Sequence, residues 1–287
     1  MPNLYQETKF IMNKYNITAN KSLGQNFLVS EDAVNSIIES AKITKQDLII
    51  EIGPGLGTLT QRLVEKAGKV VCVELDTRMV NIITERFSLY DNIEIINEDV
   101  LKVNLQELIQ TQKQEHNLTS AKVVANLPYY ITTPIIMKLL EDKLDIQSIT
   151  IMIQKEVAQR LVANPGDNIS GAITYGIHYY TEPESVTEVP HDAFIPAPEV
   201  DSQVIKLNVR KNPPVRVVDE AKLFQLIKQA FMQRRKTLTN ALANGTFFAS
   251  KQEVEEMLKS LEIDTKIRGE KLTLEQFAQI TNYEKDK

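Results

Sequence analysis

The amino-acid sequence predicts an α/β fold with a mostly parallel sheet, followed by a small helical domain. Three observations support this. Short apolar runs alternate with helical stripes through the first 160 or so residues, a glycine-rich turn follows the first of these runs, and the pattern becomes helical beyond residue 212. Strands that alternate with helices are typical of a parallel sheet covered on both faces.

Five strands and five helices are expected in the first part of the chain. The strands are apolar runs bounded by turn residues, at 48–52, 69–74, 93–96, 122–125 and 148–153. The helices carry apolar residues at helical spacing, at 31–41, 58–66, 78–87, 134–140 and 155–161. Ser30 precedes the first helix as its expected N-cap. A further strand is expected at 203–209.

The pattern changes at Asn212-Pro213-Pro214, because two prolines cannot continue a strand. Beyond this linker we expect helices around the apolar stripes at 223–231 and 254–261, and a last helix opened by a capping box at Thr273. The predicted domains are therefore residues 1–211, a Rossmann-like α/β domain, and residues 212–287, a small helical domain.

The composition is that of a soluble globular protein, with 287 residues, 43% of them hydrophobic and 25% charged. No run approaches the roughly 18 apolar residues that a membrane span needs. The N-terminus has no apolar stretch for a signal peptide, and a single cysteine, Cys72, fits a reducing compartment. We therefore expect a cytoplasmic protein without membrane contact. The three histidines have no ligand spacing, so no metal site is expected.

The charge is unevenly distributed. The net charge of −5 counts against a nucleic-acid partner, yet the stretch 206–236 holds nine basic residues against two acids. That stretch is +7 and the rest of the chain −12. Two interpretations stay open: a positive surface for phosphates, or a solvated helix face.

A glycine loop, Gly53-Pro54-Gly55-Leu56-Gly57, follows a predicted strand and precedes a helix. Glycine lets a ligand approach the backbone closely. The loop lacks the Gly-Lys-Ser/Thr ending of a phosphate-binding P-loop. Thr58 stands where a dinucleotide fold has its third glycine. The loop therefore fits a nucleoside ligand without a pyrophosphate.

Three polar residues follow the next strands. Glu74 ends the second strand and can accept hydrogen bonds from ribose hydroxyls. Asp99 follows the third strand and can accept from an adenine amino group, and Asn126 follows the fourth. Open α/β sheets bind ligands at the carboxyl ends of their strands. Together with the glycine loop, this set favours a methionine–nucleoside cofactor over a structural turn.

The segment Asn126-Leu127-Pro128-Tyr129 is the sharpest motif. An adenine amino nitrogen is a poor nucleophile, because its lone pair is delocalised into the ring. The Asn126 side-chain oxygen and the Leu127 carbonyl can accept its two hydrogens, Pro128 stiffens the turn, and Tyr129 can stack on the base. The alternative is an ordinary Asn-x-Pro turn after a strand, with a structural role only.

A second candidate for the target-base site is the proline-containing loop 194–202. Phe194 at its start can form the other side of a base sandwich with Tyr129. The same segment also reads as a loop that leads into the strand at 203–209, and the two interpretations are compatible.

Several motifs together resemble the family of ribosomal RNA adenine dimethyltransferases, above all its bacterial small-subunit members, whose loss gives kasugamycin resistance. The matching segments are 21–28 (Lys-Ser-Leu-Gly-Gln-Asn-Phe-Leu), the glycine loop, 126–129, 154–157 (Gln-Lys-Glu-Val) and 194–202. The resemblance runs from about Lys21 to the segment 272–278, nearly the whole chain.

This resemblance implies that residues 1–211 are a catalytic domain with a seven-stranded class I methyltransferase sheet that uses S-adenosylmethionine. It implies that the helical residues 212–287 serve RNA and ribosome recognition. It implies dimethylation of N6 on each of two adjacent adenines in the 3′-terminal hairpin of 16S rRNA, during late assembly of the small (30S) ribosomal subunit. The protein is expected to act as a monomer.

The resemblance also assigns roles by motif. The residues expected to hold the cofactor are Asn26, Leu28, Gly53, Glu74, Asp99 and Asn126. The residues expected at the target base are Asn126, Leu127, Pro128, Tyr129 and Phe194. The basic run Arg234-Arg235-Lys236 is expected to bind RNA.

Three alternatives remain at this point. Macrolide-resistance methylases act on 23S rRNA, and typically resemble Asn-Ile-Pro-Tyr or Asn-Ile-Pro-Phe where this chain has Leu127. A non-catalytic assembly factor for the small subunit would use the fold only to bind. A small-molecule methyltransferase would not need the basic helical domain.

Overall fold

The computed structural model describes residues 3–20, 23–245 and 247–283. The chain forms two compact units: Met1–Ala158 with Glu184–Val209, and Gln159–Pro183 with Arg210–Lys287. The second unit thus contains residues 159–183, which a boundary at residues 211 and 212 assigns to the first. Among the described residues, no helix has the length and apolar character needed to cross a membrane.

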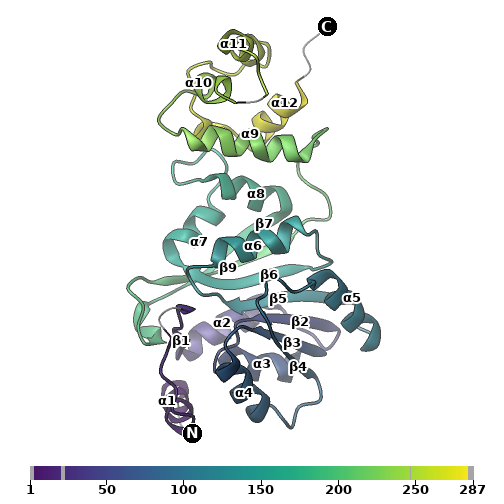
Figure 1. The fold of residues 1–287 in the computed structure, drawn as a ribbon, viewed down its shortest axis with the longest axis vertical. Helices are drawn as coiled ribbons and strands as arrows, with labels where there is room; N and C mark the ends of the chain where they lie inside the picture. The colour runs from purple at the N-terminus through teal and green to yellow at the C-terminus, as the bar shows by residue number, and fades with distance from the viewer. Residues whose placement is uncertain (1–2, 21–22, 246, 284–287) are drawn as a thin grey trace. The chain divides into compact units, whose positions relative to one another are not determined.

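A seven-stranded sheet forms the framework of the first unit, with strand order β4-β3-β2-β5-β6-β9-β7 (Figure 1). The pairs from β4 to β6 are parallel, and β9 runs antiparallel to β6. The strands are β2 (Asp47–Ile52), β3 (Lys69–Glu74), β4 (Ile93–Asn97), β5 (Ser120–Asn126), β6 (Ser148–Gln154), β7 (Thr181–Val189) and β9 (Ser202–Val209). This arrangement confirms the expected Rossmann-like methyltransferase fold class.

One face of the sheet packs against α2 (Glu31–Ala41), α3 (Thr58–Lys66) and α4 (Thr77–Arg86). Alternate strand residues point to this face, and their side chains share one buried cluster with the three helices. The buried members that come from the seven-stranded sheet are Ile49, Val70, Cys72, Val124, Met152, Val189 and Val204. Since each fully buried aliphatic side chain contributes about 1.5–3 kcal/mol, this cluster holds the strand ends in a fixed arrangement.

Local sequence explains where these helices begin. Ser30 caps α2 by accepting a hydrogen bond from Ala33 N at 3.3 Å, as expected, and Asp76 caps α4 by accepting from Arg78 N at 3.0 Å. The remaining helices of the α/β pattern are α5 (Leu105–Glu115), α6 (Thr132–Glu141) and α7 (Lys155–Val162). Helix α5 contacts β2 and β5.

The N-terminal segment holds structure that the apolar pattern did not predict. It begins with α1 (Leu4–Lys14), at the bottom of the view in Figure 1, and continues to a short strand, β1 (Phe27–Leu28). Strand β1 pairs antiparallel with β8 (Phe194–Ile195), and Val29 N donates to Ala193 O at 2.8 Å. This pairing joins two segments that lie far apart in the sequence and that both carry predicted site residues.

Helices form the core of the second unit. They are α8 (Ala172–Tyr180), α9 (Glu220–Met232), α10 (Leu238–Ala243), α11 (Lys251–Ser260) and α12 (Leu274–Asn282), the last four drawn from green to yellow in Figure 1. The capping box expected at Thr273 is confirmed, because its hydroxyl accepts from Gln276 N at 3.2 Å and the Gln276 side chain accepts from Thr273 N at 2.9 Å. The Tyr175 hydroxyl donates to Leu272 O at 2.6 Å inside this core.

Candidate active site

A pocket opens at the carboxyl ends of the parallel strands in the first unit, where open α/β sheets bind ligands. The loops after β2, β3, β4 and β5 form its walls together with the N-terminal segment around β1. All ten residues expected at the cofactor or the target base line it. They are Asn26, Leu28, Gly53, Glu74, Asp99, Asn126, Leu127, Pro128, Tyr129 and Phe194.

The glycine loop leaves open space at one wall of the pocket. Gly53 has a φ of +66°, and a Cβ placed there would meet nothing nearer than Pro128 Cδ at 3.9 Å. Gly57 has a φ of +85°, and a Cβ there would lie 2.6 Å from Phe87 Cε2. The first glycine therefore keeps the pocket free for a ligand, whereas the second allows α3 to begin close to α4.

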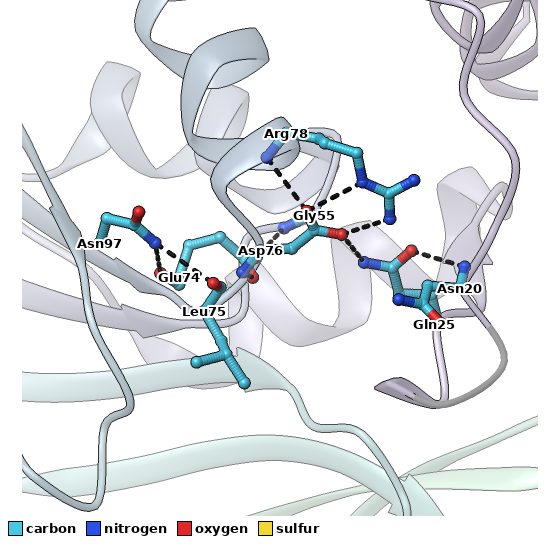
Figure 2. A network of polar contacts seen from close by, with 8 residues as sticks. All are labelled: Asn20, Gln25, Gly55, Glu74, Leu75, Asp76, Arg78 and Asn97. Carbon is cyan, nitrogen blue, oxygen red and sulfur yellow. Dashed lines mark hydrogen bonds and ion pairs between the residues drawn. The ribbon is translucent and has the colours of Figure 1, made fainter.

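The Glu74 carboxylate is held by two backbone N–H groups. Asp76 N donates to Oε1 at 2.8 Å and Gly55 N to Oε2 at 3.1 Å, as Figure 2 shows. Burial raises the pKa of Glu74 above its usual value, and these two N–H groups oppose that effect. A carboxylate oxygen can accept two hydrogen bonds, so each oxygen keeps a site for a ligand hydroxyl.

A network of polar contacts surrounds this acid (Figure 2). Arg78 binds the Asp76 carboxylate through Nε at 3.0 Å and Nη2 at 2.6 Å, and holds its pKa below the usual value. Asn97 Nδ2 donates to the backbone oxygens of Glu74 at 2.9 Å and Leu75 at 3.2 Å. The loop after β3 is therefore held by Arg78 of α4 and by Asn97 of β4.

Asp99 lies in the turn after β4, where its Oδ1 accepts from Leu101 N at 3.0 Å. Its side chain is half-buried and lines the pocket next to Glu98. Leu75, which is 50% exposed, also lines the pocket. An apolar side chain beside an acceptor suits a flat aromatic ring that carries an amino group.

Glu51 is a buried acid at the floor of the pocket that the sequence analysis did not select. It is 1% exposed, and Thr60 Oγ1 and Cys72 Sγ both donate to its Oε2, at 2.7 Å and 3.4 Å. Burial raises the pKa of Glu51 to about 7 and also raises the pKa of the Cys72 thiol. Its signal in the sequence is a single acid within the otherwise apolar run at 48–52.

Two consecutive acceptors at the end of β5 have no donor among the described residues. Asn126 Nδ2 donates to Asn26 O at 3.5 Å, and Oδ1 accepts no hydrogen bond there. The Leu127 backbone nitrogen donates to Met152 O at 3.1 Å, while its carbonyl accepts none from the described residues. The next carbonyl, Pro128 O, accepts from Ile131 N at 3.3 Å and Thr132 Oγ1 at 3.1 Å, which fixes the turn. The pocket therefore presents a rigid pair of acceptors.

Two aromatic residues complete this end of the pocket. The Tyr129 hydroxyl shares a 2.6 Å hydrogen bond with Ser202 Oγ, and burial raises the Tyr129 pKa, so the phenol stays neutral. Phe194 is 4% exposed and packs in the cluster beneath α2 and α3. Tyr129 thus offers a half-buried ring to the pocket, and Phe194 contributes a small part of its surface.

Several residues that line the pocket were given no role in the sequence analysis, although some of them belong to its motifs. They come from the segment before β1, from the ends of β2 to β4 and from the turn before α6, namely Leu23, Gly24, Gln25, Phe27, Glu51, Leu56, Leu75, Glu98, Val100 and Tyr130. Lys21 and Ser22, which belong to the matching motif at 21–28, lie outside the described residues. Among the described residues, no cluster of three His, Cys, Asp or Glu side chains can hold a metal ion.

The predicted RNA-binding run lies in the second unit, between α9 and α10. Arg234 donates through Nη2 to the carbonyls of Asn168 at 3.4 Å and Ser170 at 3.3 Å, and its guanidinium lies 5.7 Å from the centre of the Phe231 ring. Arg235 and Lys236 are exposed and make no side-chain hydrogen bond or ion pair within the described ranges. The three cations are therefore not equivalent.

The basic stretch at 206–236 is also divided by the fold. Lys206 is 8% exposed within β9 of the first unit, and burial lowers its pKa. Arg210 pairs with Glu182 at 2.7 Å, and Lys222 Nζ donates to Thr281 O at 2.7 Å in the second unit. The nine basic residues therefore do not form one continuous free positive surface.

Comparisons with known proteins show the family of the chain. A family model described as "Ribosomal RNA adenine dimethylase" matches residues 16–286. The chain is 47% identical over 275 residues to the ribosomal RNA small subunit methyltransferase A of Alkaliphilus metalliredigens, covering 96% of this chain and 95% of the relative.

Two solved structures share the fold. A dimethyladenosine transferase from Plasmodium falciparum superposes with a TM-score of 0.74 at 25% identity, over 88% of this chain and 95% of that one. The 23S rRNA methyltransferase ErmE superposes with a TM-score of 0.69 at 23% identity, over 89% and 98% of the two chains.

Proposed function

This chain belongs to the ribosomal RNA adenine dimethylase family, and on that premise we propose that it dimethylates N6 of two adjacent adenines in the 3′-terminal hairpin of 16S rRNA, with S-adenosylmethionine as the methyl donor. The reaction takes place in the cytoplasm on a precursor of the small ribosomal subunit. The observation that carries the proposal is the pair of acceptors, Asn126 Oδ1 and Leu127 O, which have no donor among the described residues.

The pocket fits the proposed cofactor. Glu74 offers acceptors to two ribose hydroxyls, and Asp99 Oδ2 offers one to the adenine amino group, beside the apolar Leu75. The open space at Gly53, together with Asn26 and Leu28 of the N-terminal segment, leaves room for the methionine part. When bound, the cofactor supplies a sulfonium-activated methyl group.

The task of the protein is to activate and orient the amino nitrogen. Asn126 Oδ1 and Leu127 O accept its two hydrogens and favour a tetrahedral nitrogen, whose lone pair is then available to form the new bond to carbon. The nitrogen gives up one proton to solvent water as each methyl is added, so only one hydrogen remains for the acceptor pair at the second transfer. Because the turn is fixed before the base arrives, little reorganisation is needed at the moment of reaction.

The aromatic residues are proposed to hold the base outside its stack. Tyr129 stacks on it, since the hydrogen bond to Ser202 fixes the ring plane and the neutral phenol brings no charge into the site. Phe194, mostly buried, closes the pocket from the β8 side. Arg235 and Lys236 are proposed to contact RNA phosphates.

Replacement of Asn126 tests this proposal. We expect Asn126→Ala to lower the rate of methyl transfer to small subunits by at least about a hundredfold, as is typical when a preorganised polar group at the reacting atoms is removed. S-adenosylmethionine affinity, measured by calorimetry, should stay within about tenfold, because Glu74 and Asp99 remain. Asn81→Ala, on the exposed face of α4, is the matched control.

Normal turnover in the Asn126→Ala variant would refute the role of the acceptor pair. Absence of S-adenosylmethionine binding by the wild-type protein would refute the cofactor.

A further inference from the structure

We propose that Gln25 is a positioning residue for the cofactor, because its side chain ties the N-terminal segment to Asp76, the residue whose backbone N–H holds the Glu74 carboxylate. This inference rests on the proposed function of the pocket and assigns a role to a residue of the 21–28 motif that the sequence analysis left without one. Figure 2 shows the contacts that carry it.

The first part of the tie is a closed loop within the N-terminal segment. Gln25 Oε1 accepts from Asn20 N at 2.8 Å, and Gln25 N donates to Asn20 O at 3.2 Å. Leu23 N also donates to Asn20 O, at 3.1 Å. These bonds set the direction in which the chain enters the pocket wall at residues 23–28, all of which line the pocket.

The second part is the bond from Gln25 Nε2 to Asp76 Oδ2, at 2.9 Å. The Asp76 side chain is 6% exposed, and Arg78 keeps it ionised through two contacts at 3.0 Å and 2.6 Å. A hydrogen bond to a charged, largely buried acceptor is stronger than one between neutral groups. Asp76 therefore makes both contacts: its carboxylate accepts from the Gln25 side chain, and its backbone N–H donates to the Glu74 carboxylate.

Loss of the Gln25 side-chain hydrogen bonds should affect only part of the N-terminal segment. The N-terminal segment is also held by the pairing of β1 with β8, so loss of Gln25 does not release the whole segment. The change is expected at residues 23–26 before β1, which include Asn26. We therefore expect faster loss of bound cofactor, with the reacting groups at Asn126 and Leu127 still in place.

The test compares Gln25→Ala with Gln61→Ala. Gln61 is also half-buried and also makes two side-chain bonds, to Glu65 Oε1 at 2.8 Å and the Tyr90 hydroxyl at 2.9 Å, but does not line the pocket. For Gln25→Ala we expect the Kd for S-adenosylmethionine and its KM to rise about tenfold, with kcat within about twofold of the wild type. Gln61→Ala should bind as the wild type does.

A reciprocal exchange tests whether the pair itself matters. Gln25→Glu places a second carboxylate beside Asp76 and should weaken binding at least as much as alanine does. In the double variant Gln25→Glu with Asp76→Asn, the amide at position 76 can donate to the carboxylate at position 25. This hydrogen bond runs in the opposite direction to the wild-type one and should recover most of the lost affinity for S-adenosylmethionine. Such a cycle isolates the coupling between the two side chains.

The outcomes separate the two claims. If wild-type protein binds S-adenosylmethionine but Gln25→Ala binds it equally well, or Gln61→Ala loses as much affinity, the positioning role is overturned and the cofactor site stands. A fall in kcat without a change in KM, or no recovery in the double variant, also overturns it. If the wild-type protein does not bind S-adenosylmethionine, the proposed function itself fails.

Discussion

At the scale of single residues, main-chain N–H and C=O groups make several of the contacts that define the pocket. Backbone N–H groups orient Glu74, and a backbone carbonyl, Leu127 O, is one of the two proposed acceptors for the target amine. The sequence showed that an acid and an amide stand at strand ends. It did not show which of their atoms are left without partners, because that depends on contacts with residues far away in the chain.

Replacement of Glu74 measures the ribose contact. We expect Glu74→Ala to weaken S-adenosylmethionine binding by roughly 2–4 kcal/mol, since two hydrogen bonds to a charged acceptor are lost. Glu74→Gln keeps one acceptor oxygen and should lose less. Glu65→Ala, on the exposed face of α3, is the control for calorimetry. Equal affinity in the wild type and Glu74→Ala would mean that the ribose binds elsewhere.

The buried acid Glu51 makes stability depend on pH. Burial raises its pKa from 4.5 to about 7, so between these values the folded protein holds a proton that the unfolded chain has lost. The Glu51 contribution to stability therefore falls as pH rises through this window, and the loss is complete above about pH 7.

The neutral variant Glu51→Gln should remove this dependence. Its melting temperature relative to the wild type should be higher at about pH 8 than at about pH 5, with a difference in stability of at most roughly 3 kcal/mol. Thermal unfolding at both pH values measures it. The same difference at the two pH values would show that Glu51 does not titrate in this range.

At the scale of elements, the strands and helices with strong apolar patterns were predictable. The ranges expected for β2, α3 and β3 agree with the structure to within a residue. Three of the elements that were missed have weak patterns. Strand β7 lies at the sheet edge and is mostly polar, α10 has only six residues, and α5 is rich in glutamine. The pairing of β1 with β8 could not be predicted, because it joins residues that lie far apart.

The same limit applies to the site. The ten predicted residues lie around one pocket because parallel strands end at the same edge of a sheet, a rule that needs only the strand order along the chain. Gln25 and Glu51 were missed because their roles depend on tertiary contacts with Asp76 and with Thr60.

The glycine loop yields a prediction that separates binding from stability. Gly53→Ala incurs the strain of a positive φ, about 1–2 kcal/mol, but its methyl group fills pocket space and should weaken cofactor binding more than it lowers the melting temperature. In Gly57→Ala the added methyl group clashes with Phe87. This variant should therefore lose more stability to unfolding than affinity for the cofactor. Calorimetry and thermal unfolding of both variants check this, and equal behaviour would contradict it.

At the scale of the whole molecule, the chain has a net charge of −5, and the fold divides its basic stretch between the two units. Arg210 and Lys222 have partners within the second unit. Local charge counts from the sequence overstated the free positive surface, because they cannot separate paired cations from unpaired ones. Arg235 and Lys236 are both exposed and adjacent in the chain, and we place phosphate binding there.

Charge reversal at this pair tests the assignment. We expect Arg235→Glu with Lys236→Glu to weaken association with small-subunit particles and to lower the salt dependence of binding by about one unit of slope per lost phosphate contact. The control is Lys251→Glu with Lys259→Glu, an equal charge change on α11. Unchanged binding across a salt series would show that Arg235 and Lys236 are merely solvated.

Arg234 should behave differently from its two neighbours. Because it donates to the carbonyls of Asn168 and Ser170, Arg234→Glu should also lower the melting temperature of the protein, by an amount corresponding to about 1 kcal/mol. Thermal unfolding of the three single variants measures this. A melting temperature equal to that of Arg235→Glu would contradict the structural role of Arg234.

We propose above all that the protein methylates adenine in small-subunit RNA, and that Asn126 Oδ1 and Leu127 O activate the adenine amino group for this transfer. The most direct test is transfer of labelled methyl groups from S-adenosylmethionine to undermethylated small subunits, with the modified nucleotides mapped afterwards. We expect label on N6 of two adjacent adenines in the 3′-terminal hairpin of 16S rRNA, and incorporation at least about a hundredfold slower with Asn126→Ala. Label on 23S rRNA instead, or no label from a protein that binds both the cofactor and the particle, would contradict it.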